Sequence, residues 1–411
     1  MLIPSIDLFD GKAVQWRQGK EAVLERSDVF DLFDEFSLLG EVALIDLNAA
    51  TNRGSNRELI LELLKKRPCR VGGGIRDLET ARTYLKAGAS RLILGTAARE
   101  PWVEKLPANA LIFAIDAKGD HLLSHGWQTE SQEDPRDLLQ PLAQRCSEFL
   151  YTQVEKEGML QGLDRVRVET IVKASPIPVT VAGGITDLDD ITFLRRLGAN
   201  AQIGMALYTG RFSLTEAFLT GLKWPDSGLM PTMVQEVEGG TALMLAYSNR
   251  DSLKQAIETR KATYFSRSRN QLWVKGETSG HTQALVGIEA DCDGDTLLFK
   301  VRQTGMACHL NRPSCFPQEG HRFRLENLDQ VIAGRKVQAN PQSFTAKLFA
   351  DPAFLASKLT EECQELIEAQ TFDEVRWEAA DLIYFALVRA RAAGVSLADI
   401  EAELRSRHVN P

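Results

Sequence analysis

An internal repeat in the first 222 residues limits the possible folds of this chain more than any other feature. The segment SIDLFDGKAV at 5–14 matches AIDAKGDHLL at 114–123, and VGGGI at 71–75 matches VAGGI at 181–185. LKAGASRLILGTA also matches LRRLGANAQIGMA, and the paired segments lie 109 or 110 residues apart. Self-similarity at a fixed spacing indicates repeated structural units, so we predict that this region consists of two similar halves.

Short apolar segments alternate with helical patterns throughout the same region. The segments that indicate strands are LIPSID, VALIDL, CRVGGG, RLILGT, LIFAID, FLYTQV, IPVTVAGG and AQIGMA. Eight strands, each followed by a helix, make the pattern of a β/α barrel, and 222 residues is a suitable length for one. We therefore predict an α/β fold, a (β/α)8 TIM barrel, over residues 1–222.

Each half of the predicted barrel carries chemistry at its strand ends. Asp7 and Asp116 occupy equivalent strand ends, and each half has two strand-end glycine sites where backbone N–H groups can approach a phosphate. One glycine-rich segment alone would indicate only a tight turn. Because the sites recur in both halves, we predict a ligand with a phosphate at each end, flanked in the middle by the two aspartates as an acid and base pair.

On these residues, the segment 1–221 resembles the phosphoribosylformimino-AICAR phosphate isomerase of histidine biosynthesis. That family converts an aminoaldose into an aminoketose by an Amadori rearrangement of a substrate with two phosphates. The resemblance implies that Asp7 is the base and Asp116 the acid, with supporting contacts from Trp127 and Thr152. The implied phosphate sites comprise Gly73, Gly74, Gly95, Thr96, Gly183, Gly184 and Gly204.

The barrel departs from that family at three places. Gln15 stands where many members have Arg, and Gln153 follows Thr152 where an acidic residue is usual. The usual Asp-Gly-Thr is replaced by the sequence EGM at 157–159. Two hypotheses follow: an active isomerase, or a catalytically silent barrel that serves as a scaffold or binding module.

The segment from Tyr264 to Phe316 combines two kinds of metal-binding side chain. Asp291, Asp293 and Asp295 alternate with Cys292 and Gly294, so an extended segment would place the three carboxylates on one face. Oxygen ligands suit Mg²⁺, whereas thiolates suit Zn²⁺. The thiolates would come from Cys292, Cys308 and Cys315.

Three protein ligands would leave a zinc ion an open position for a water that is nucleophilic at neutral pH. An acidic turn and ordinary buried cysteines are the alternatives. A calcium-binding EF-hand loop that starts at Asp291 fits worse, because Thr296 stands where Gly is needed and Arg302 where Glu is needed.

The motifs SRSR at 266–269, WVKGETSGH at 273–281 and DCDGD at 291–295 resemble phosphoribosyl-AMP cyclohydrolase, as does the segment 307–316. This resemblance covers about residues 228–318, which mix strand patterns with one helix near 251–259 and indicate an α+β domain. It implies Mg²⁺ at the three aspartates and Zn²⁺ at the three cysteines. It also implies a homodimer, because that family shares its zinc site between two subunits.

The same resemblance identifies His281 and His309 as candidates for proton transfer. Arg267, Arg269 and Lys275 form a local basic cluster that can hold a small phosphorylated ligand, although a solvated mixed-charge face is the alternative. The family usually has Gly soon after the Cys-His pair, where the sequence LN stands at 310–311.

Helical periodicity dominates the last part of the chain, beyond an expected break at 317–342. Apolar residues recur at spacings of three and four, at Leu355, Leu359, Cys363 and Leu366 and at Ile383, Leu387 and Ala390. Two acidic pairs, EXXE at 362–365 and EXXD at 378–381, each lie on one helix face. A solvated face is the usual reason for such pairs, but carboxylates beside the apolar WEAADLIYFAL indicate a cation.

SFTAKLF, KLTEECQEL and WEAADLIYFAL resemble phosphoribosyl-ATP pyrophosphatase, an all-α family, over about residues 325–411. The resemblance implies that Lys358 lies near the phosphates. Thr360 replaces a common Gly, and Asp351-Pro352 alters the preceding turn. The implied Mg²⁺ ligands are Glu361, Glu362, Glu365, Glu378 and Asp381.

Composition excludes some other classes of function. A net charge of -8 argues against general nucleic-acid binding, and no segment approaches the length of a membrane span. The remaining cysteines lie far apart, which favours a reducing cytoplasm over a disulfide framework. We expect a linker at 223–228, small phosphorylated nucleotides as substrates, and three consecutive steps of histidine biosynthesis on one chain. The alternative is a bifunctional cyclohydrolase and pyrophosphatase with a silent barrel.

Overall fold

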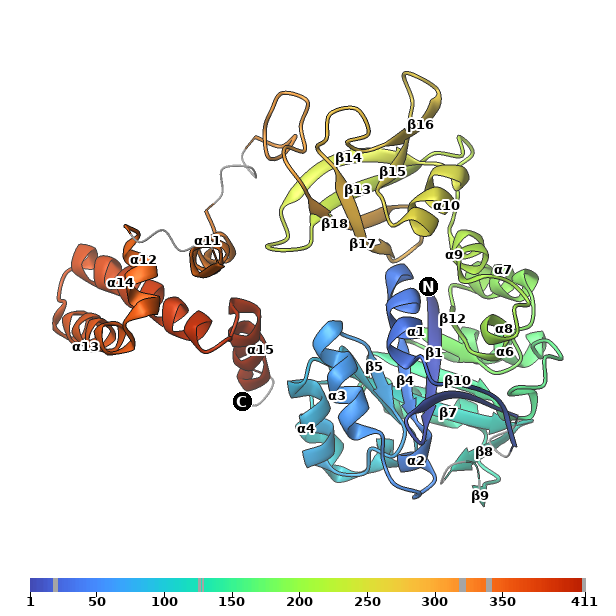
Figure 1. Cartoon of the computed structure of the whole chain (residues 1–411). Helices are drawn as coiled ribbons and strands as arrows, with labels where there is room; N and C mark the ends of the chain where they lie inside the picture. Colours follow the sequence, from blue (N-terminus) through green and yellow to red (C-terminus); the bar gives the residue numbers. More distant parts are fainter. Residues whose placement is uncertain (18–20, 125–126, 128, 318–322, 338–341, 409–411) are drawn as a thin grey trace. The chain divides into compact units, whose positions relative to one another are not determined.

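The computed structural model describes residues 1–17, 21–124, 127, 129–317, 323–337 and 342–408 (Figure 1). The chain forms two compact units. The first consists of Met1–Val237 and Ala242–Cys315, and it contains the barrel and a smaller sheet domain. The second contains Glu238–Thr241 and the chain from Phe316 onward.

Within the described residues, eight parallel strands close into a barrel (Figure 1). Their order around it is β1 (Leu2–Phe9), β4 (Ala43–Asp46), β5 (Arg70–Gly72), β6 (Arg91–Leu94), β7 (Leu111–Lys118), β10 (Glu148–Gln153), β11 (Val179–Ala182) and β12 (Asn200–Ile203), which pairs with β1 again. Every strand predicted from the sequence is present. Barrel closure brings all eight carboxyl ends to one face, where the candidate catalytic residues meet.

Helices and hairpins connect the barrel strands. The longer helices are α1 (Val29–Phe36), α3 (Arg57–Lys66), α4 (Leu78–Lys86), α6 (Arg165–Ala174), α7 (Leu188–Leu197) and α9 (Leu214–Gly221). One-turn helices are α2 (Leu47–Ala50), α5 (Leu139–Leu142) and α8 (Met205–Tyr208). The hairpins are β2 (Lys12–Arg17) with β3 (Glu21–Arg26), and β8 (His121–Ser124) with β9 (Thr129–Glu130).

The expected helix after β6 is replaced by three 3-10 turns, η2 (Thr96–Arg99), η3 (Pro101–Lys105) and η4 (Ala108–Ala110). Pro101 and Pro107 account for this difference, because a proline inside a helix removes a hydrogen bond and clashes with the preceding turn. Three further 3-10 turns are η1 (Ser37–Leu39), η5 (Pro135–Leu138) and η6 (Val154–Lys156).

Charged side chains pack near the amino ends of the barrel strands. Arg70 begins β5 and is fully buried, and its Nη1 lies 2.6 Å from Oε1 of the buried Glu148, which begins β10. Arg91 reaches the other oxygen of Glu148 at 2.7 Å, and Glu41 contacts both arginines. Because each buried charge is paired, this network supports a packed barrel interior and leaves the opposite end for the ligand.

The sheet domain begins directly after the barrel. Its strands are β13 (Met230–Glu236), β14 (Ala242–Ser248), β17 (Gln283–Ala290) and β18 (Leu297–Gln303), in the order β14-β13-β18-β17, with a separate hairpin of β15 (Thr263–Ser266) and β16 (Gln271–Val274). The predicted helix is α10 (Arg250–Thr259). The expected linker packs against this domain, because the Lys223 amide donates to the Gly294 carbonyl at 2.8 Å.

The second unit is helical. It comprises α11 (Leu325–Val337), α12 (Phe344–Ala350), α13 (Pro352–Glu368), α14 (Phe372–Ala392) and α15 (Leu397–His408). The expected break at 317–342 is wrong in part, since α11 lies within it and its Ile332 is fully buried in the core. Asp351 caps α13 by accepting from the amides of Ala353 and Phe354, and Pro352 takes the first turn as predicted.

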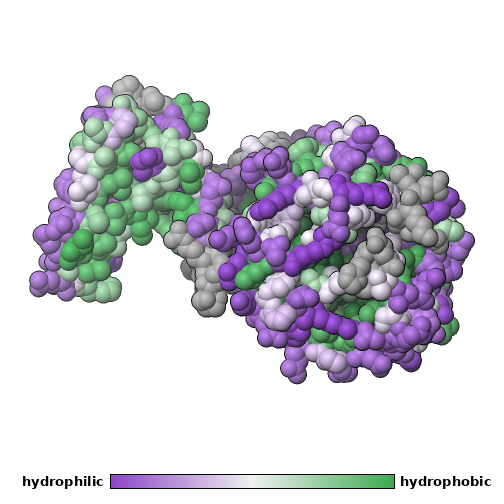
Figure 2. All heavy atoms as spheres, turned by 90° about the horizontal axis from the view of Figure 1, so that it is seen from below, coloured by the Kyte–Doolittle hydropathy of each residue, from purple (hydrophilic) through white to green (hydrophobic). Residues whose placement is uncertain are grey.

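The helical unit, on the left of Figure 2, exposes much apolar surface on the visible face. Phe372 is 80% exposed, Ile367 71% and Trp377 67%. The core of this unit is small, centred on Leu348, Leu355 and Val388. No described helix is long and apolar enough to cross a membrane.

Candidate active sites

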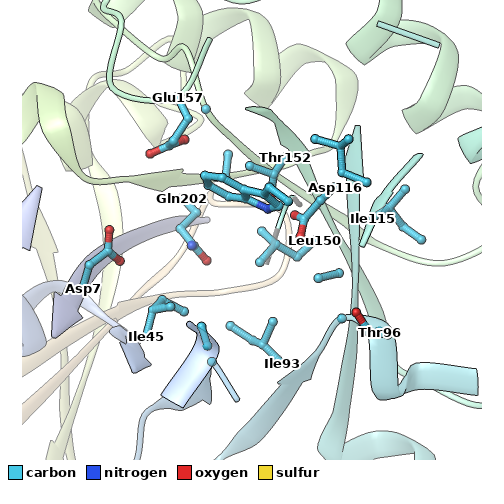
Figure 3. Close-up of a pocket in the computed structure, with 18 of the residues that line it drawn as sticks. Asp7, Ile45, Ile93, Thr96, Ile115, Asp116, Leu150, Thr152, Glu157 and Gln202 are labelled. Atoms are coloured by element: carbon cyan, nitrogen blue, oxygen red, sulfur yellow. The ribbon is translucent and has the colours of Figure 1, made fainter. Parts of the chain in front are cut away.

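A cavity of about 810 Å³ opens at the carboxyl ends of the barrel strands (Figure 3). All residues that the sequence marked in the barrel line it: Asp7, Gly73, Gly74, Gly95, Thr96, Asp116, Trp127, Thr152, Gly183, Gly184 and Gly204. The structure therefore brings together residues from both halves of the repeat. This volume is in the range of small-molecule sites.

Asp7 and Asp116 approach the cavity from opposite sides (Figure 3). Burial raises the pKa of Asp7 to about 6, and the Ser5 hydroxyl, which donates to Asp7 Oδ1 at 2.9 Å, opposes this rise. Burial also raises the pKa of Asp116, opposed by hydrogen bonds from Trp127 and Thr152. Two carboxyls with raised pKa values on either side of a bound molecule suit acid–base chemistry near neutral pH.

The glycine sites are shaped by close backbone contacts that only glycine permits. Gly73 has a φ of +89°, and a Cβ there would lie 2.4 Å from the Asp46 carbonyl oxygen. Gly183, its counterpart in the other half, has a φ of +79°, and a Cβ would lie 2.6 Å from the Gln153 carbonyl oxygen. The two halves thus repeat the same packing of a glycine turn on the end of the preceding strand.

Gln153 is one of the departures from the isomerase family, and both ends of its side-chain amide form hydrogen bonds. Its side chain is 1% exposed, its Nε2 donates to the Asp164 carbonyl at 3.2 Å, and its Oε1 accepts from the Asp164 amide at 3.0 Å. In the first half of the barrel, the carboxylate of the buried Asp46 likewise accepts a hydrogen bond from a loop backbone amide, that of Asn56, at 2.8 Å. The amide therefore keeps the loop after β10 in place without a charge.

Glu157 is a cavity residue that the sequence analysis missed. It belongs to the departing segment 157–159, and its carboxyl faces the cavity with Asp7 and Asp116 (Figure 3). Burial, followed by the charges of these two aspartates, raises the pKa of Glu157 to about 8. The neighbouring Gly158 packs under β2, where a Cβ would lie 2.5 Å from the Trp16 carbonyl oxygen. The Glu in place of the usual Asp was the only available signal.

In the sheet domain, the acidic motif forms a turn rather than the expected extended segment. Asp291 Oδ1 accepts from the amides of Asp295 and Thr296 at 3.0 and 3.1 Å, which bends the chain. The carboxylate oxygens of Asp291, Asp293 and Asp295 can lie within 4.8 Å of one another, which fits a hard divalent cation. Lys223 occupies part of this space, with its Nζ 3.0 Å from Asp293 Oδ2.

The three cysteines do not meet within one chain. Cys308 and Cys315 lie side by side, and burial together with Cys308 raises the pKa of the Cys315 thiol. Cys292 lies in the turn before β18, whereas Cys308 follows the other end of this strand. Seven residues of strand span roughly 20 Å, so one chain presents a pair of thiols and a distant third.

Lys275 lies near the cysteine pair, and His281 packs next to Lys275. His281 Nδ1 accepts from the Met306 amide at 3.2 Å, so its Nε2 carries the proton of the neutral ring. Lys275 is buried, its Nζ donates to the His281 carbonyl at 3.2 Å, and burial lowers its pKa. His309 is exposed next to Cys308.

The two predicted arginines are on the tip of the β15–β16 hairpin. Both are exposed, and their guanidinium groups stack on rings: Arg267 lies 3.9 Å from the Tyr247 ring centroid and Arg269 lies 5.8 Å from that of Trp273. Stacking leaves the N–H edge of a guanidinium available for phosphate oxygens.

The helical unit gathers carboxylates from two helices. Oxygens of Glu362 and Glu365 on α13 and of Glu378 on α14 can lie within 4.8 Å of one another. Burial raises the pKa of Glu362, and the charges of Asp381 and Glu365 add to the rise. Glu361 instead pairs with Lys358 at 2.7 Å. The carboxylates of Glu362, Glu365 and Glu378 repel one another. A divalent cation bound between them would relieve this repulsion, so the cluster fits Mg²⁺.

Models of known families match the chain in three consecutive segments. The histidine biosynthesis protein model covers residues 1–213, more than half of the chain. The chain belongs to the histidine biosynthesis protein family. The phosphoribosyl-AMP cyclohydrolase model follows at 244–317 and the phosphoribosyl-ATP pyrophosphohydrolase model at 325–408. These matches confirm the families and the order expected from the sequence.

Curated relatives carry corresponding names. The histidine biosynthesis bifunctional protein HisIE of Deinococcus radiodurans is 40% identical over 202 residues, which cover 46% of this chain and 93% of that protein. The histidine biosynthesis trifunctional proteins of Kluyveromyces lactis and Neurospora crassa are 45% and 41% identical over 48% and 58% of this chain. The chain spans about a quarter of the length of these two trifunctional proteins.

Proposed function

We propose that this chain is a trifunctional enzyme of histidine biosynthesis. The helical unit would hydrolyse phosphoribosyl-ATP to phosphoribosyl-AMP and pyrophosphate. The sheet domain would open the adenine ring of phosphoribosyl-AMP by hydrolysis, and the barrel would isomerise the resulting aminoaldose to the aminoketose. The observation that carries the proposal is the barrel cavity, in which two partly buried aspartates face each other between repeated glycine sites.

In the barrel, Asp7 would accept a proton from the substrate carbon that becomes the ketone, and Asp116 would donate a proton as the sugar ring opens. The pKa of Asp7, about 6, leaves this group ionised and able to act as a base at neutral pH. The raised pKa of Asp116 favours its role as an acid. Trp127 and Thr152 would orient Asp116 through their hydrogen bonds.

The rival hypothesis, a silent barrel that serves as a scaffold, fits these contacts less well. A barrel that serves only as a scaffold needs neither aspartate in its cavity. Gln153, which replaces the usual acidic residue, still fixes the loop after β10 through its two hydrogen bonds to the Asp164 backbone. Gly73 and Gly183 also keep the tight backbone turns at which N–H groups can come close to a phosphate.

In the sheet domain, zinc would activate a water molecule and Mg²⁺ would hold the substrate phosphates. Cys308 and Cys315 would supply two zinc ligands, and Cys292 of a second copy would supply the third, because it is remote within one chain. This supports a homodimer as the active form. His281 is the better candidate for proton transfer than His309, since its ring is held by the Met306 amide.

In the helical unit, the acidic cluster would hold Mg²⁺ on the triphosphate and stabilise the pyrophosphate leaving group. The six cysteines are all free, which supports a reducing, cytoplasmic location.

The decisive experiment supplies purified protein with phosphoribosyl-ATP, Mg²⁺ and Zn²⁺ and separates the products by chromatography, because the isomerase substrate and product have equal mass. Accumulation of the aminoketose is expected. Accumulation of the aminoaldose alone would overturn the isomerase assignment and support the scaffold hypothesis. No phosphoribosyl-AMP at all would contradict the assignment of the helical unit.

A further inference from the structure

A chain of three polar side chains crosses the sheet domain and ends at the turn after β18. Tyr264 Oη lies 2.7 Å from Gln283 Oε1, and Gln283 Nε2 lies 2.8 Å from Gln303 Oε1. Gln303 Nε2 in turn lies 2.8 Å from the Thr304 carbonyl oxygen. Tyr264 is fully buried and Gln283 is 2% exposed, so the first part of the chain is withdrawn from water.

The Thr304 carbonyl sets the direction of the hydrogen bonds in this chain. A carbonyl only accepts, so the NH2 group of Gln303 must face Thr304 and its oxygen must face Gln283. The NH2 group of Gln283 then donates to that oxygen, and its own oxygen accepts from the Tyr264 hydroxyl. Reversal of the Gln303 amide would place two oxygens against each other, so its donor is held on Thr304.

The turn that accepts this hydrogen bond also holds the His281 ring. Thr304 and Gly305 are exposed and follow the last residue of β18, so few packing contacts fix them. The Met306 amide donates to His281 Nδ1 at 3.2 Å. Gly305 has a φ of +70°, and a Cβ there would overlap His281 Nδ1. The ring therefore packs directly on this turn, and a shift of the turn would move the Met306 donor.

The main-chain pairing of the turn does not replace the Gln303 bond. The Thr304 amide donates to the Thr282 carbonyl at 2.9 Å, one residue beyond the pair of Gln283 and Gln303 that begins β17 and ends β18. This bond fixes the peptide before Thr304. The Gln303 side chain fixes the peptide after it, which leads through Gly305 to Met306. An apolar side chain at position 303 could pack at the strand end but could not hold this second peptide.

We propose that Gln303 is a positioning residue for His281. Its NH2 group holds the Thr304 carbonyl, and the turn fixed in this way presents the Met306 amide to His281 Nδ1. Nδ1 thus stays an acceptor, and the proton of the neutral ring stays on Nε2, where it can be transferred. This inference rests on the proposed cyclohydrolase function, in which His281 is the candidate for proton transfer.

The test replaces Gln303 by Met, which has a similar length and no donor. The kcat of phosphoribosyl-AMP hydrolysis is expected to fall about tenfold, with a smaller change in KM, because a misplaced proton-transfer group loses most of its contribution. In the His281→Ala background, the same replacement is expected to leave kcat unchanged, since Gln303 acts through this ring. A tenfold fall in that background as well, or an unchanged kcat for Gln303→Met alone, would overturn the inference.

Tyr264→Phe is the matched control, because it removes one bond of the same chain and spares the bond to Thr304. It leaves Gln283 Oε1 buried without its donor, so the midpoint of urea unfolding is expected to fall while kcat stays close to normal. A kcat loss that follows the loss of stability, greater for Tyr264→Phe than for Gln303→Met, would show that the chain only supports the fold and would overturn the positioning role.

The outcome for the proposed function is separable from this one. If the unmodified chain does not hydrolyse phosphoribosyl-AMP, or His281→Ala has no measurable rate, ¹⁵N nuclear magnetic resonance of histidine-labelled protein replaces kcat. His281→Ala then identifies the His281 signals. A decline of the Nε2-protonated form in Gln303→Met, but not in Tyr264→Phe, supports the positioning role even where the cyclohydrolase assignment fails. Unchanged His281 signals in Gln303→Met overturn it.

Discussion

The barrel and the sheet domain prepare their sites in opposite ways. The barrel encloses its site within one chain: Asp7 and Asp116 come from opposite halves and line one cavity, where both are partly buried. The sheet domain leaves its site open, with Asp293 and Asp295 about half exposed and Cys292 apart from Cys308. A closed barrel can surround a ligand with its own strand ends, whereas a four-stranded open sheet has faces and edges that another copy can complete.

The largest expected effect tests the closed site. Asp7→Asn removes the proposed base, so we expect the isomerase kcat to fall about 1000-fold, as for the loss of general base catalysis. The cyclohydrolase and pyrophosphatase activities of the same protein should be unchanged, which controls for folding. Chromatographic separation of aminoaldose and aminoketose measures the effect. Normal aminoketose formation by this variant would contradict the role of Asp7.

The second prediction tests where the open site is completed. Cys292→Ser and Cys308→Ser should each lose cyclohydrolase activity, because each removes one of the proposed zinc ligands. After subunit exchange, an equal mixture of the two should recover roughly a quarter of the normal activity, since half of the dimers are mixed and each contains one intact site.

The barrel supplies the contrasting control for this mixture. Asp7→Asn mixed with Asp116→Asn should recover no isomerase activity, because both groups must belong to the same cavity. If the cysteine mixture stays inactive although mass analysis shows mixed dimers, the three thiols act within one chain. Recovery in the aspartate mixture would show that the barrel also shares its site.

The third prediction concerns the charge inside the cavity. The folded chain keeps the Glu157 proton up to a pH of about 8, whereas an unfolded Glu releases it near its ordinary pKa, about 4.3. The folded state therefore binds more protons in this window, and stability falls as the pH rises through it. Glu157→Gln should remove this loss and raise the free energy of unfolding by up to about 5 kcal/mol at pH 8 to 9, with little difference near pH 4, because each unit of pKa difference corresponds to about 1.4 kcal/mol.

Urea unfolding at several pH values measures this effect. Glu155→Gln is the matched control, because Glu155 lies 3.4 Å from Arg167 and gains from its charge. The control should show no stabilisation at pH 8. A Glu157→Gln curve parallel to that of the unmodified chain would contradict the raised pKa.

The smallest expected effect concerns the open acidic turn. Lys223 pairs with Asp293 at 3.0 Å and with Asp295 at 3.6 Å, so it competes with a divalent cation for these carboxylates. Exposed ion pairs contribute little, and we expect Lys223→Met to strengthen Mg²⁺ binding about twofold to threefold in calorimetric titration. Lys12→Met, which breaks the exposed pair with Glu25, should leave this affinity unchanged. Equal affinity for all three proteins would exclude competition.

The sequence was most informative where chemistry follows regular secondary structure. The apolar segments around Asp7 and Asp116 identified strands, and parallel strands in a barrel place their carboxyl ends on one face. Both aspartates could therefore be assigned to one site before any coordinates were known. The helix after β6 was predicted wrongly because the barrel pattern places a helix after every strand, while Pro101 and Pro107 prevent it here.

The rest depended on loop paths and side-chain surroundings, which have no periodic signal. Glu157 reaches the cavity only because Gly158 packs under β2, a contact between segments distant in the sequence. DCDGD predicted a shared face of carboxylates, but the Asp291 side chain bends it into a turn.

By itself, the sequence determined the order of the three domains, the barrel strands and the residue types of each site, because these depend on local patterns and motifs. Only the tertiary structure decided which of those residues meet. It enclosed Asp7, Asp116 and Glu157 in one cavity and separated Cys292 from Cys308, since strand register and loop packing set the distances between side chains.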